Sequence, residues 1–392
     1  MHLLSAFLLL AVALPLAYLY LLALASTHSR RTRPLPRAHH RFAIAIPAHD
    51  EEGVIGHSLA ALRQLEYPPQ LFDVHVVADH CHDRTAQIAR ATGAIVHERQ
   101  AAGRSGKGAA LNWLLPRVLD DPTGTPHDAV VIFDADTRVA PDFLGVMDAR
   151  LARGELAIQG QHRIGNPQDG WFPALAWAML MIDNRFQNLG RANLGWSAKN
   201  MGDSICVQAD VLRRLGWSEG LTEDYAFRHR LLMQGVRIGY EPAAIGYGEA
   251  PITWRAAGAQ RARWLRGTHD VSRRTASQLL WQGLRQRDLA LLDGALQACL
   301  PSYSSLTLLA LAAFGVQLLL RVSPGWLGLW ALVVAALALY PLLGLALERA
   351  PLRAYLVILS GPLFILWRTW LALRTRLGRA GLEWVRTPRH VP

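Results

Sequence analysis

The stretch Ala129–Asp136, AVVIFDAD, decides the fold, because an apolar and largely β-branched run ends in two carboxylates, Asp134 and Asp136. Such a run predicts a short buried strand, and the acidic residues mark its carboxyl end. Two earlier stretches have the same shape, FAIAIP at Phe42–Pro47 and DVHVVAD at Asp73–Asp79. The sequence therefore predicts three similar strands, each followed by polar residues.

Helical patterns lie between these strands, at Glu52–Leu65, Asp83–Ala91 and Gly108–Leu119. Strands that alternate with helices of this length are typical of βαβ units, so we expect an α/β domain with a mainly parallel sheet. Ligands of such sheets bind at the carboxyl ends of the strands. Acidic residues stand at or just past those ends: Asp50, Asp79, Asp134 and Asp136. We therefore expect a binding site along this edge.

The carboxylates of Asp134 and Asp136 would repel one another inside a site, unless a cation lay between them or one was protonated. A divalent cation bridged to a diphosphate removes that repulsion, and carboxylate oxygens suit Mg2+ or Mn2+. A strand-end turn stabilised by an aspartate side chain explains the pair equally well. Both interpretations stay open at this point.

The segment ADHCHDRTA places Asp79 at a strand end and Asp83 where a helix begins. Helix capping explains Asp83, whereas Asp79 is able to accept hydrogen bonds from a nucleobase or a ribose. The glycine-rich loop Ala101–Leu111 then carries Arg104 and Lys107 ahead of a helix. This arrangement suits an anionic ligand, although the spacing is not that of a P-loop, and a solvated basic loop is the alternative.

The segment GLTEDYAF places Glu223 and Asp224 at the start of an apolar-periodic helix, directly after Thr222. Thr222 suits the N-cap, and acidic residues in a first turn favour the helix dipole. The functional interpretation is that one of the two carboxylates acts as a general base for a hydroxyl nucleophile.

The segment AQRARW, Ala259–Trp264, follows further along the chain. In a helix, Gln260, Arg263 and Trp264 share one face, because they lie three and four residues apart. That face offers an amide, a guanidinium able to bind a phosphate, and an aromatic platform. Arg261 points elsewhere, toward solvent or lipid headgroups.

The run Leu3–Leu24 contains no charged residue and is long enough to cross a bilayer. Arginines follow it at once: Arg30, Arg31, Arg33, Arg37 and Arg41. The positive-inside rule then places the N-terminus outside and the following domain in the cytoplasm. The rival interpretation is a cleaved signal peptide, but no Lys or Arg precedes the run. We expect a retained anchor.

Two further apolar runs, Ser302–Leu320 and Trp326–Leu347, are each long enough to span a bilayer, and the short linker between them predicts a helical hairpin. The last run, Ala354–Trp367, is short and precedes a basic tail, which the positive-inside rule keeps in the cytoplasm. We expect this run to be interfacial or re-entrant, giving three spans, with four as the alternative.

The chain of 392 residues is 51% hydrophobic and carries a formal net charge of +11. Much of that charge flanks the apolar runs, which favours a membrane surface over nucleic acid as the partner. The cysteines, Cys81, Cys206 and Cys299, show neither a disulfide nor a metal pattern. The 15 histidines show no metal-ligand spacing and are interpreted as surface or supporting residues.

Six motifs in this order, PAHDEE, ADHCHDRTA, SGKG, DAD, TED and QRARW, resemble the family 2 glycosyltransferases over about Phe42–Asp270. More closely, they resemble the membrane-embedded branch with the cellulose, chitin, hyaluronan and poly-N-acetylglucosamine synthases. The resemblance implies a GT-A fold, a Rossmann-like nucleotide-sugar-binding domain in the cytoplasm, between N- and C-terminal transmembrane helices. It also implies an inverting transfer from a nucleotide sugar, usually a UDP-sugar.

The resemblance further implies a role for each matching residue. By this resemblance the substrate-binding residues are Pro47, Glu51, Asp79, Lys107, Gln260, Arg263 and Trp264, the ligands of Mg2+ or Mn2+ are Asp134 and Asp136, and the catalytic residues are Glu223 and Asp224. Asp79 would contact the uridine and Lys107 the nucleotide or its phosphates. Gln260 and Arg263 would engage the diphosphate, Trp264 would stack near the acceptor, and Asp224 would be the base.

The sequence departs from the family pattern in two places. Asp50 stands where relatives usually carry Asn, a change that should keep the turn. The segment KNMGDS, Lys199–Ser204, stands where relatives often show a glycine-rich segment near the acceptor, which bears on the acceptor that fits.

We expect an N-terminal transmembrane helix at 1–26, a basic linker at 27–41, a GT-A domain at 42–270, an amphipathic segment at 271–301, a transmembrane hairpin at 302–347, and an interfacial helix with a basic tail at 348–392. The predicted activity is β-transfer from UDP-glucose or UDP-N-acetylglucosamine to a growing polysaccharide at the bacterial inner membrane. Three or four spans are few for an export channel, so a homo-oligomer or an export partner would be needed. The alternatives are single addition to a membrane lipid, and a non-catalytic nucleotide-binding scaffold.

Overall fold

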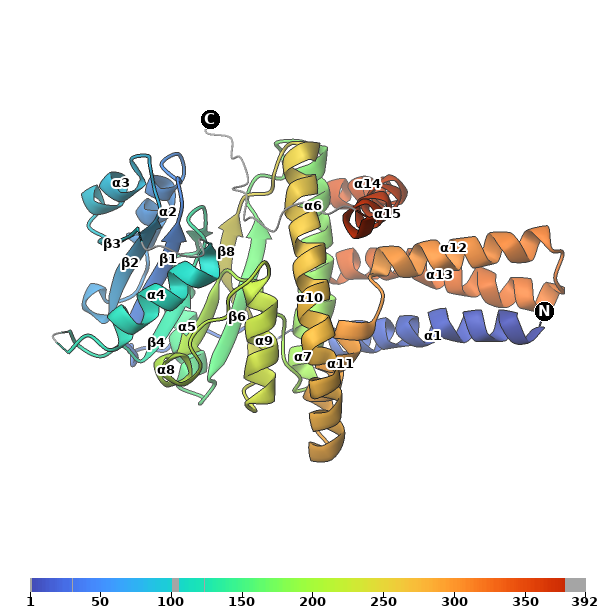
Figure 1. Cartoon of the computed structure of the whole chain (residues 1–392), viewed down its shortest axis with the longest axis horizontal. Helices are drawn as coiled ribbons and strands as arrows, with labels where there is room; N and C mark the ends of the chain where they lie inside the picture. The colour runs from blue at the N-terminus through green and yellow to red at the C-terminus, as the bar shows by residue number, and fades with distance from the viewer. Residues whose placement is uncertain (1, 30, 101–105, 123, 378–392) are drawn as a thin grey trace.

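The computed structural model describes residues 2–29, 31–100, 106–122 and 124–377 of the chain. It consists of a domain built around one sheet and a group of apolar helices that projects from it (Figure 1). Arg104 of the glycine-rich loop, Arg30 of the linker, and the predicted basic tail beyond Leu377 lie outside the described residues.

Within the described residues, one sheet contains eight strands in the order β3-β2-β1-β4-β7-β6-β8-β5. The strands are β1 Phe42–Ala48, β2 Phe72–Asp79, β3 Ile95–Arg99, β4 Ala129–Ile132, β5 Arg138–Val139, β6 Ala157–Ile164, β7 Ile205–Gln208 and β8 Ile238–Gly248. Strands β1 to β4 pair in parallel, as predicted. Strand β7 is antiparallel to β4 and β6, and β5 is antiparallel to β8, so the second half of the sheet is mixed.

Helices of the domain cover both faces of this sheet (Figure 1). They are α2 Ile55–Leu62, the 3-10 turn Pro69–Leu71, α3 Thr85–Ala91, α4 Lys107–Leu119, α5 Phe143–Leu151, α6 Trp171–Asp183, the π-helical turn Asn184–Leu189, α7 Gly190–Asn193, α8 Ala209–Leu215, α9 Glu223–Met233 and α10 Trp254–Gln286. Helices α4, α8 and α9 pack on one face, around Leu111, Leu212 and Phe227. Helices α2 and α5 pack on the other face, around Leu59 and Phe143.

The two carboxylates of AVVIFDAD follow the strand directly, as predicted. Strand β4 stops at Ile132, because the next residues form a turn in which the amide of Thr137 donates to the carbonyl of Asp134 (3.0 Å). The predicted helix Glu52–Leu65 is shorter than expected, since α2 begins at Ile55. Asp50 in the preceding turn has φ +52°, a left-handed conformation that Asn and Asp tolerate, so the turn is kept.

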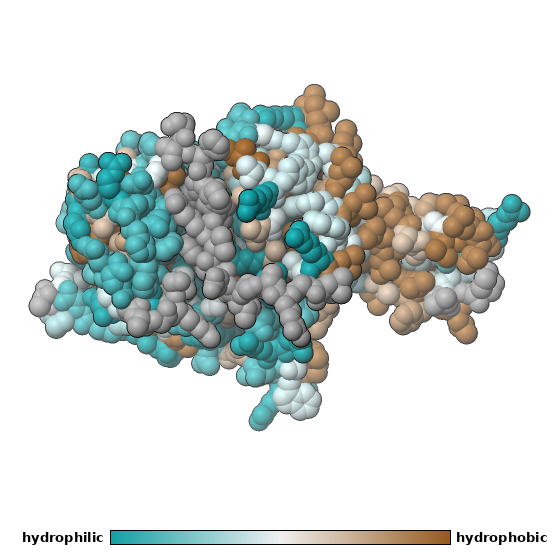
Figure 2. Space-filling view, turned by 45° about the horizontal axis from the view of Figure 1, so that its top comes forward, coloured by the Kyte–Doolittle hydropathy of each residue, from teal (hydrophilic) through white to brown (hydrophobic). Residues whose placement is uncertain are grey.

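Three apolar helices form the projecting bundle: α1 His2–Ala25, α12 Tyr303–Leu319 and α13 Pro324–Leu347 (Figure 1). Figure 2 shows that hydrophobic residues, in brown, dominate its surface. Ser5–Ala25 and Pro324–Leu347 are long and apolar enough to cross a membrane, and up to four spans result if each of two bent helix pairs counts as one. The predicted hairpin corresponds to α12 and α13. The predicted three spans and the alternative of four both lie within this range of two to four.

The interior of this bundle is filled by side chains. Leu16, Leu306 and Trp330 meet in its centre, and each is at most 6% exposed. Near the outer end, the amide of Gln317 donates to the hydroxyl of Ser5 (2.9 Å). The helices are therefore packed against one another along most of their length.

The last two helices, α14 Leu352–Ile358 and α15 Gly361–Leu377, lie beside α6 and α10 (Figure 1). Phe364 and Trp367 of α15 pack on Phe172 of α6. Helix α10 runs without a break through the predicted domain boundary at 270 and 271, and α11 Leu289–Cys299 follows it. The segment 271–301 is therefore not a separate element.

A buried ion cluster joins the bundle to the domain. Asp293 of α11 accepts hydrogen bonds from the hydroxyl of Tyr18 on α1 (2.5 Å) and from Arg191 Nε on α7 (2.8 Å). Arg228 Nη2 on α9 completes the cluster at 3.4 Å from the same carboxylate. Arg191 and Arg228 have no exposed surface, so four elements from both parts of the molecule share one buried cluster in which a single carboxylate pairs with two guanidinium groups.

Candidate active site

A cavity of about 2710 Å³ opens at the carboxyl ends of β1, β2 and β4 and extends to the apolar helices α1, α12 and α13. Asp50, although expected at this edge, does not line this cavity, whereas the residues to which the family resemblance assigns a role do: Pro47, Glu51, Asp79, Lys107, Asp134, Asp136, Glu223, Asp224, Gln260, Arg263 and Trp264. The predicted edge of the sheet is therefore where the structure brings these side chains together.

Asp79 ends β2 and is buried at the wall of the cavity. Its Oδ1 accepts from Arg99 Nη1 (2.5 Å) and lies 2.8 Å from His80 Nδ1, while its Oδ2 accepts from the amide of Gly106 (3.3 Å). Arg99 and His80 fix the orientation of this carboxylate. Asp83 accepts from the amide of Thr85 (2.9 Å) at the start of α3, which agrees with a capping role, although Arg84 is the N-cap residue.

Lys107 lies at the first position of α4 and reaches across to the turn after β4. Its ammonium group donates to Asp134 Oδ1 and to the carbonyl of Gly202. Burial alone would lower the pKa of Lys107, but Asp134 and Glu223 raise it above its ordinary value, so the side chain is charged. Lys107 thus supplies a positive charge beside the two aspartates of the turn.

The turn itself is held by Asp203, a residue that the sequence singled out only as part of KNMGDS. Its Oδ1 accepts from the amide of Asp134 (3.0 Å) and from Thr137 Oγ1 (2.9 Å). Its Oδ2 accepts from Ser204 Oγ (3.1 Å) and lies 2.6 Å from His162 Nδ1. Asp203 is 1% exposed, so this carboxylate belongs to a buried network that positions Asp134.

The pKa values of the Asp203–His162 pair move in opposite directions. Burial would raise the pKa of Asp203, but the hydrogen bond and charge of His162 lower it. Burial would likewise lower the pKa of His162, but the contact with Asp203 raises it. The two groups therefore form a buried ion pair. His162 lies on β6, which the sequence did not predict, and no local motif marks it.

Asp134 and Asp136 fit a hard divalent cation by their chemistry. Their carboxylates lie on alternate residues of one turn at the cavity wall, and carboxylate oxygens are preferred ligands of Mg2+ and Mn2+. The amide of Glu249 donates to Asp136 Oδ2 (3.1 Å), which orients that side chain.

Glu223 and Asp224 begin α9 on the opposite wall. Burial raises the pKa of both carboxyl groups above their ordinary values, and for Glu223 the neighbouring Asp224 adds to the effect. Thr222 occupies the N-cap position, but its side chain makes no capping bond. It packs instead against Gly267 of α10, where a Cβ would lie 2.6 Å from it.

Gly202 of KNMGDS lies close to Asp224. It has φ +78°, and a Cβ placed there would lie 3.4 Å from Asp224 Oδ2, which is van der Waals contact. This departure from the family pattern therefore lies directly beside the predicted base.

Gln260, Arg263 and Trp264 of α10 line the cavity together, as predicted. Arg263 Nη1 also donates to the carbonyl of Leu221, just before α9 (3.4 Å). The prediction that Arg261 faces solvent or lipid headgroups is wrong. Its guanidinium lies over the ring of Phe172 (4.3 Å) and lines the same cavity, because α6 and α15 cover that side of α10.

Comparisons with known proteins place these features in a family. A model of the glycosyltransferase-like family 2 matches residues 39–267. The chain is 27% identical over 256 residues to the probable glycosyltransferase YdaM of Bacillus subtilis, covering 59% of this chain and 56% of the relative. It is 29% identical over 237 residues to the beta-monoglucosyldiacylglycerol synthase of Trichormus variabilis, covering 57% and 48%. It spans about half the length of these curated relatives.

A solved structure is similar along nearly the whole chain. It is the mannosyltransferase PcManGT from Pyrobaculum calidifontis in complex with GDP-Man and Mn2+, with 19% identity and a TM-score of 0.57 over 96% of this chain and 98% of that one. This likeness concerns the fold, and it confirms the predicted GT-A fold. Because the family model covers more than half of the chain, the protein belongs to the glycosyltransferase-like family 2, and the predicted glycosyltransferase domain is confirmed.

Proposed function

We propose that this protein transfers a single sugar, with inversion, from a UDP-sugar to a hydroxyl group of a membrane lipid. The observation that carries the proposal is the continuity of the cavity, which runs from the carboxylates at the sheet edge to the apolar helices. The polar end of the cavity suits a nucleotide-sugar donor, and the apolar end suits the tails of a lipid acceptor.

In the proposed donor site, Asp79, held by Arg99, accepts hydrogen bonds from the nucleoside, and Pro47 and Glu51 line the same region. Asp134 and Asp136 would hold Mg2+ or Mn2+, which neutralises diphosphate charge when bound. Gln260 and Arg263 bind the diphosphate from the other wall, and Lys107 lies close enough to add positive charge. Charge on the leaving diphosphate is thereby stabilised in a partly water-excluded site.

In the proposed acceptor site, Asp224 removes the proton from the attacking hydroxyl. Its raised pKa suits this role, because burial makes the carboxylate a stronger base. Glu223 lies beside it and shares the charge of Lys107. Trp264, with 44% of its surface exposed, offers an aromatic face to the acceptor.

The bundle favours a lipid over a growing polysaccharide as the acceptor. The helices α1, α12 and α13 bury Leu16, Leu306 and Trp330 between them, so a conduit for a sugar chain would require these side chains to part. The cavity nevertheless reaches Leu306 and Leu337, where lipid tails have apolar contacts. A polysaccharide acceptor would need a conduit between several copies or through an export partner.

The names of relatives support each acceptor in part. One relative is a beta-monoglucosyldiacylglycerol synthase, whose name specifies a lipid product. Another, 25% identical over 262 residues, is a poly-beta-1,6-N-acetyl-D-glucosamine synthase of Staphylococcus epidermidis, whose name specifies a polymer. The proposed location is the bacterial cytoplasmic membrane with the catalytic domain inside, as the arginines after α1 favour.

The test is a panel of UDP-sugars, with GDP-mannose included, incubated with the full chain in bilayer nanodiscs of bacterial lipid and with Mg2+ or Mn2+. We expect nucleotide release for one donor, and a lipid fraction whose mass has increased by one sugar. A ladder of masses or a water-soluble polymer would favour the polysaccharide acceptor instead. No nucleotide release with any donor, in a folded protein that binds UDP, would support the scaffold interpretation.

A further inference from the structure

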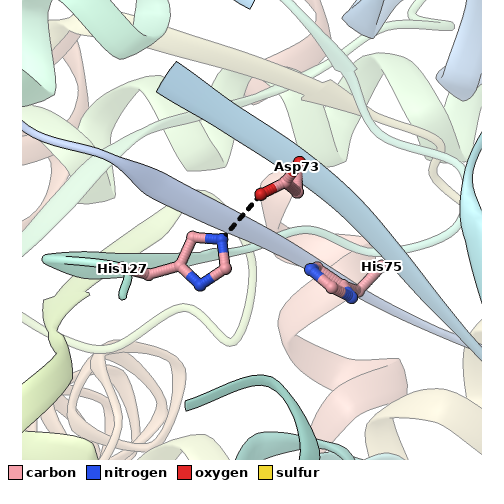
Figure 3. Close-up of side chains that lie close together, drawn as sticks. All are labelled: Asp73, His75 and His127. Atoms are coloured by element: carbon pink, nitrogen blue, oxygen red, sulfur yellow. Dashed lines mark hydrogen bonds and ion pairs between the residues drawn. The ribbon is translucent and has the colours of Figure 1, made fainter. Parts of the chain in front are cut away.

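A cluster of histidines lies at the edge of the sheet opposite the active site. Asp73 and His75 lie near the start of β2, and His127 lies just before β4. Figure 3 shows the three side chains turned toward one another. His75 and Asp73 are four and six residues from Asp79, so along the strand the cluster is about 13–20 Å from the active-site cavity.

The topology of the sheet brings these distant residues together. Strand β1 lies between β2 and β4, and Ala43 pairs with both Asp73 and Val130. His127 Nε2 lies 2.9 Å from Asp73 Oδ2.

The two rings carry nitrogen atoms that hydrogen bonding within the described residues does not use. His75 Nε2 and His127 Nδ1 are buried and have no partner there. His75 and His127 are 7% and 8% exposed. A buried polar atom without a partner costs about 1–3 kcal/mol, so a purely structural network explains this cluster incompletely.

One nitrogen from each ring and one carboxylate oxygen of Asp73 all lie within 4.8 Å of one another. A tetrahedral zinc ion with bonds of about 2.1 Å needs ligand atoms about 3.4 Å apart, so binding would require side-chain rotations that shorten the longest of these separations. We propose that Asp73, His75 and His127 form a binding site for a transition-metal ion, of which Zn2+ is the best match. Imidazole nitrogens and one carboxylate suit zinc better than magnesium or calcium.

Two neighbouring residues, His97 and Arg41, contact the proposed metal ligands. His97 of β3 lies beside the site, with its Nε2 3.2 Å from His75 Nδ1, and is partly exposed. Arg41 donates to Asp73 Oδ2 (2.5 Å) and to the carbonyl of Gln70 (2.6 Å). The guanidinium and a metal ion would compete for the same carboxylate, so Arg41 limits the affinity of the site.

The test uses the untagged full chain in detergent, treated with a chelator to remove bound metal. The protein is then titrated with Zn2+ in the presence of excess Mg2+, which occupies sites made only of carboxylates. We expect one Zn2+ per chain in wild type and in His57→Gln, an exposed histidine elsewhere that serves as the control. His75→Gln and His127→Gln should each bind Zn2+ at least about tenfold more weakly.

A further variant keeps the test decisive if those proteins fold poorly. Arg41→Gln retains Asp73, His75 and His127 and should bind Zn2+ more tightly than wild type, with Co2+ giving the visible absorption of a tetrahedral site. No binding by wild type at micromolar Zn2+, or unchanged binding in a folded His127→Gln, would overturn the proposal. Weaker Zn2+ binding in Arg41→Gln than in wild type would contradict the proposed competition between Arg41 and the metal ion for Asp73.

Discussion

The variant Asp203→Asn tests the buried network that holds the aspartate turn. Asparagine keeps an acceptor for the amide of Asp134 and for Thr137 Oγ1, but it replaces the charged contact with His162, which measures 2.6 Å in wild type. A hydrogen bond to a charged group contributes about 1.5–3 kcal/mol. We expect a loss of about 2 kcal/mol of unfolding free energy, which lowers the thermal midpoint of a domain of this size by about 4–8 °C.

The loss of unfolding free energy in Asp203→Asn should depend on pH in a defined direction. Because Asp203 raises the pKa of His162, the pair stabilises the fold fully below the pKa of an unfolded histidine, and this contribution disappears as pH rises through the raised value. Because the pKa of Asp203 is lowered, the contribution is also lost as pH falls through that lowered value. The difference between wild type and variant should therefore be largest between these two pKa values.

The assay is thermal unfolding of the full chain in detergent, followed by the fluorescence of its 13 tryptophans. A double-mutant cycle with His162→Gln isolates the pair, and Ser204→Ala removes another bond to the same carboxylate without removing a charge. We expect a coupling of about 2 kcal/mol near pH 6 that shrinks as pH rises through the raised pKa of His162. Additive effects of Asp203→Asn and His162→Gln near pH 6 would refute the reasoning.

Four other variants test the site. Asp224→Asn should lower turnover at least about 100-fold while leaving UDP binding largely intact, as isothermal titration would show; lost UDP binding contradicts the base assignment. Asp136→Ala should weaken UDP binding only when Mg2+ or Mn2+ is present, so equal affinity with and without metal counts against a metal ligand. Trp264→Ala should raise the KM for the acceptor more than the Kd for UDP. Equal increases in both constants would contradict the assignment of Trp264 to the acceptor. Gly202→Ala forces a side chain into a φ of +78° against Asp224; we expect about 1–2 kcal/mol of lost stability and reduced turnover, whereas unchanged thermal midpoint and rate would be inconsistent with that contact.

The parts of the fold that could be predicted are those with a local signal. Strand β1 was expected at Phe42–Pro47 and extends to Ala48, because buried β-branched residues and a following polar turn mark it clearly. Strand β6, AIQGQHRI, was missed because its polar residues break the apolar pattern. Its Gln159 is buried, and the side chain donates to the carbonyl of Asp203 (2.7 Å), a contact that only the tertiary structure supplies.

The distinction between features with a local sequence signal and features that depend on tertiary structure also applies to the site. Asp79, Asp134 and Asp136 line one cavity because parallel strands bring their carboxyl ends to one edge. The predicted residues of α9 and α10 reach the same cavity from the opposite wall, which only the packing of these helices supplies. His162 and Asp203 were missed because they are 41 positions apart and meet only when β6 and β7 pair. Thr222 shows the limit of a local rule, since packing against Gly267 replaces the expected capping bond.

The ion cluster around Asp293 makes α1, a candidate membrane span, part of what holds the proposed base in place. Arg228 lies one turn after Asp224 on α9, and its guanidinium meets the carboxylate that also binds Tyr18 of α1. A protein cut free of α1 and α11 would leave Arg191 and Arg228 without their counter-ion, at a cost of about 3–5 kcal/mol. That is a large share of the total stability of about 5–15 kcal/mol expected for a folded domain. If α1 spans a bilayer, as proposed, a change in bilayer thickness that tilts α1 would be transmitted through Tyr18 to Asp293 and Arg191, and from Asp293 to Arg228 of α9. Turnover would then be sensitive to the surrounding lipid.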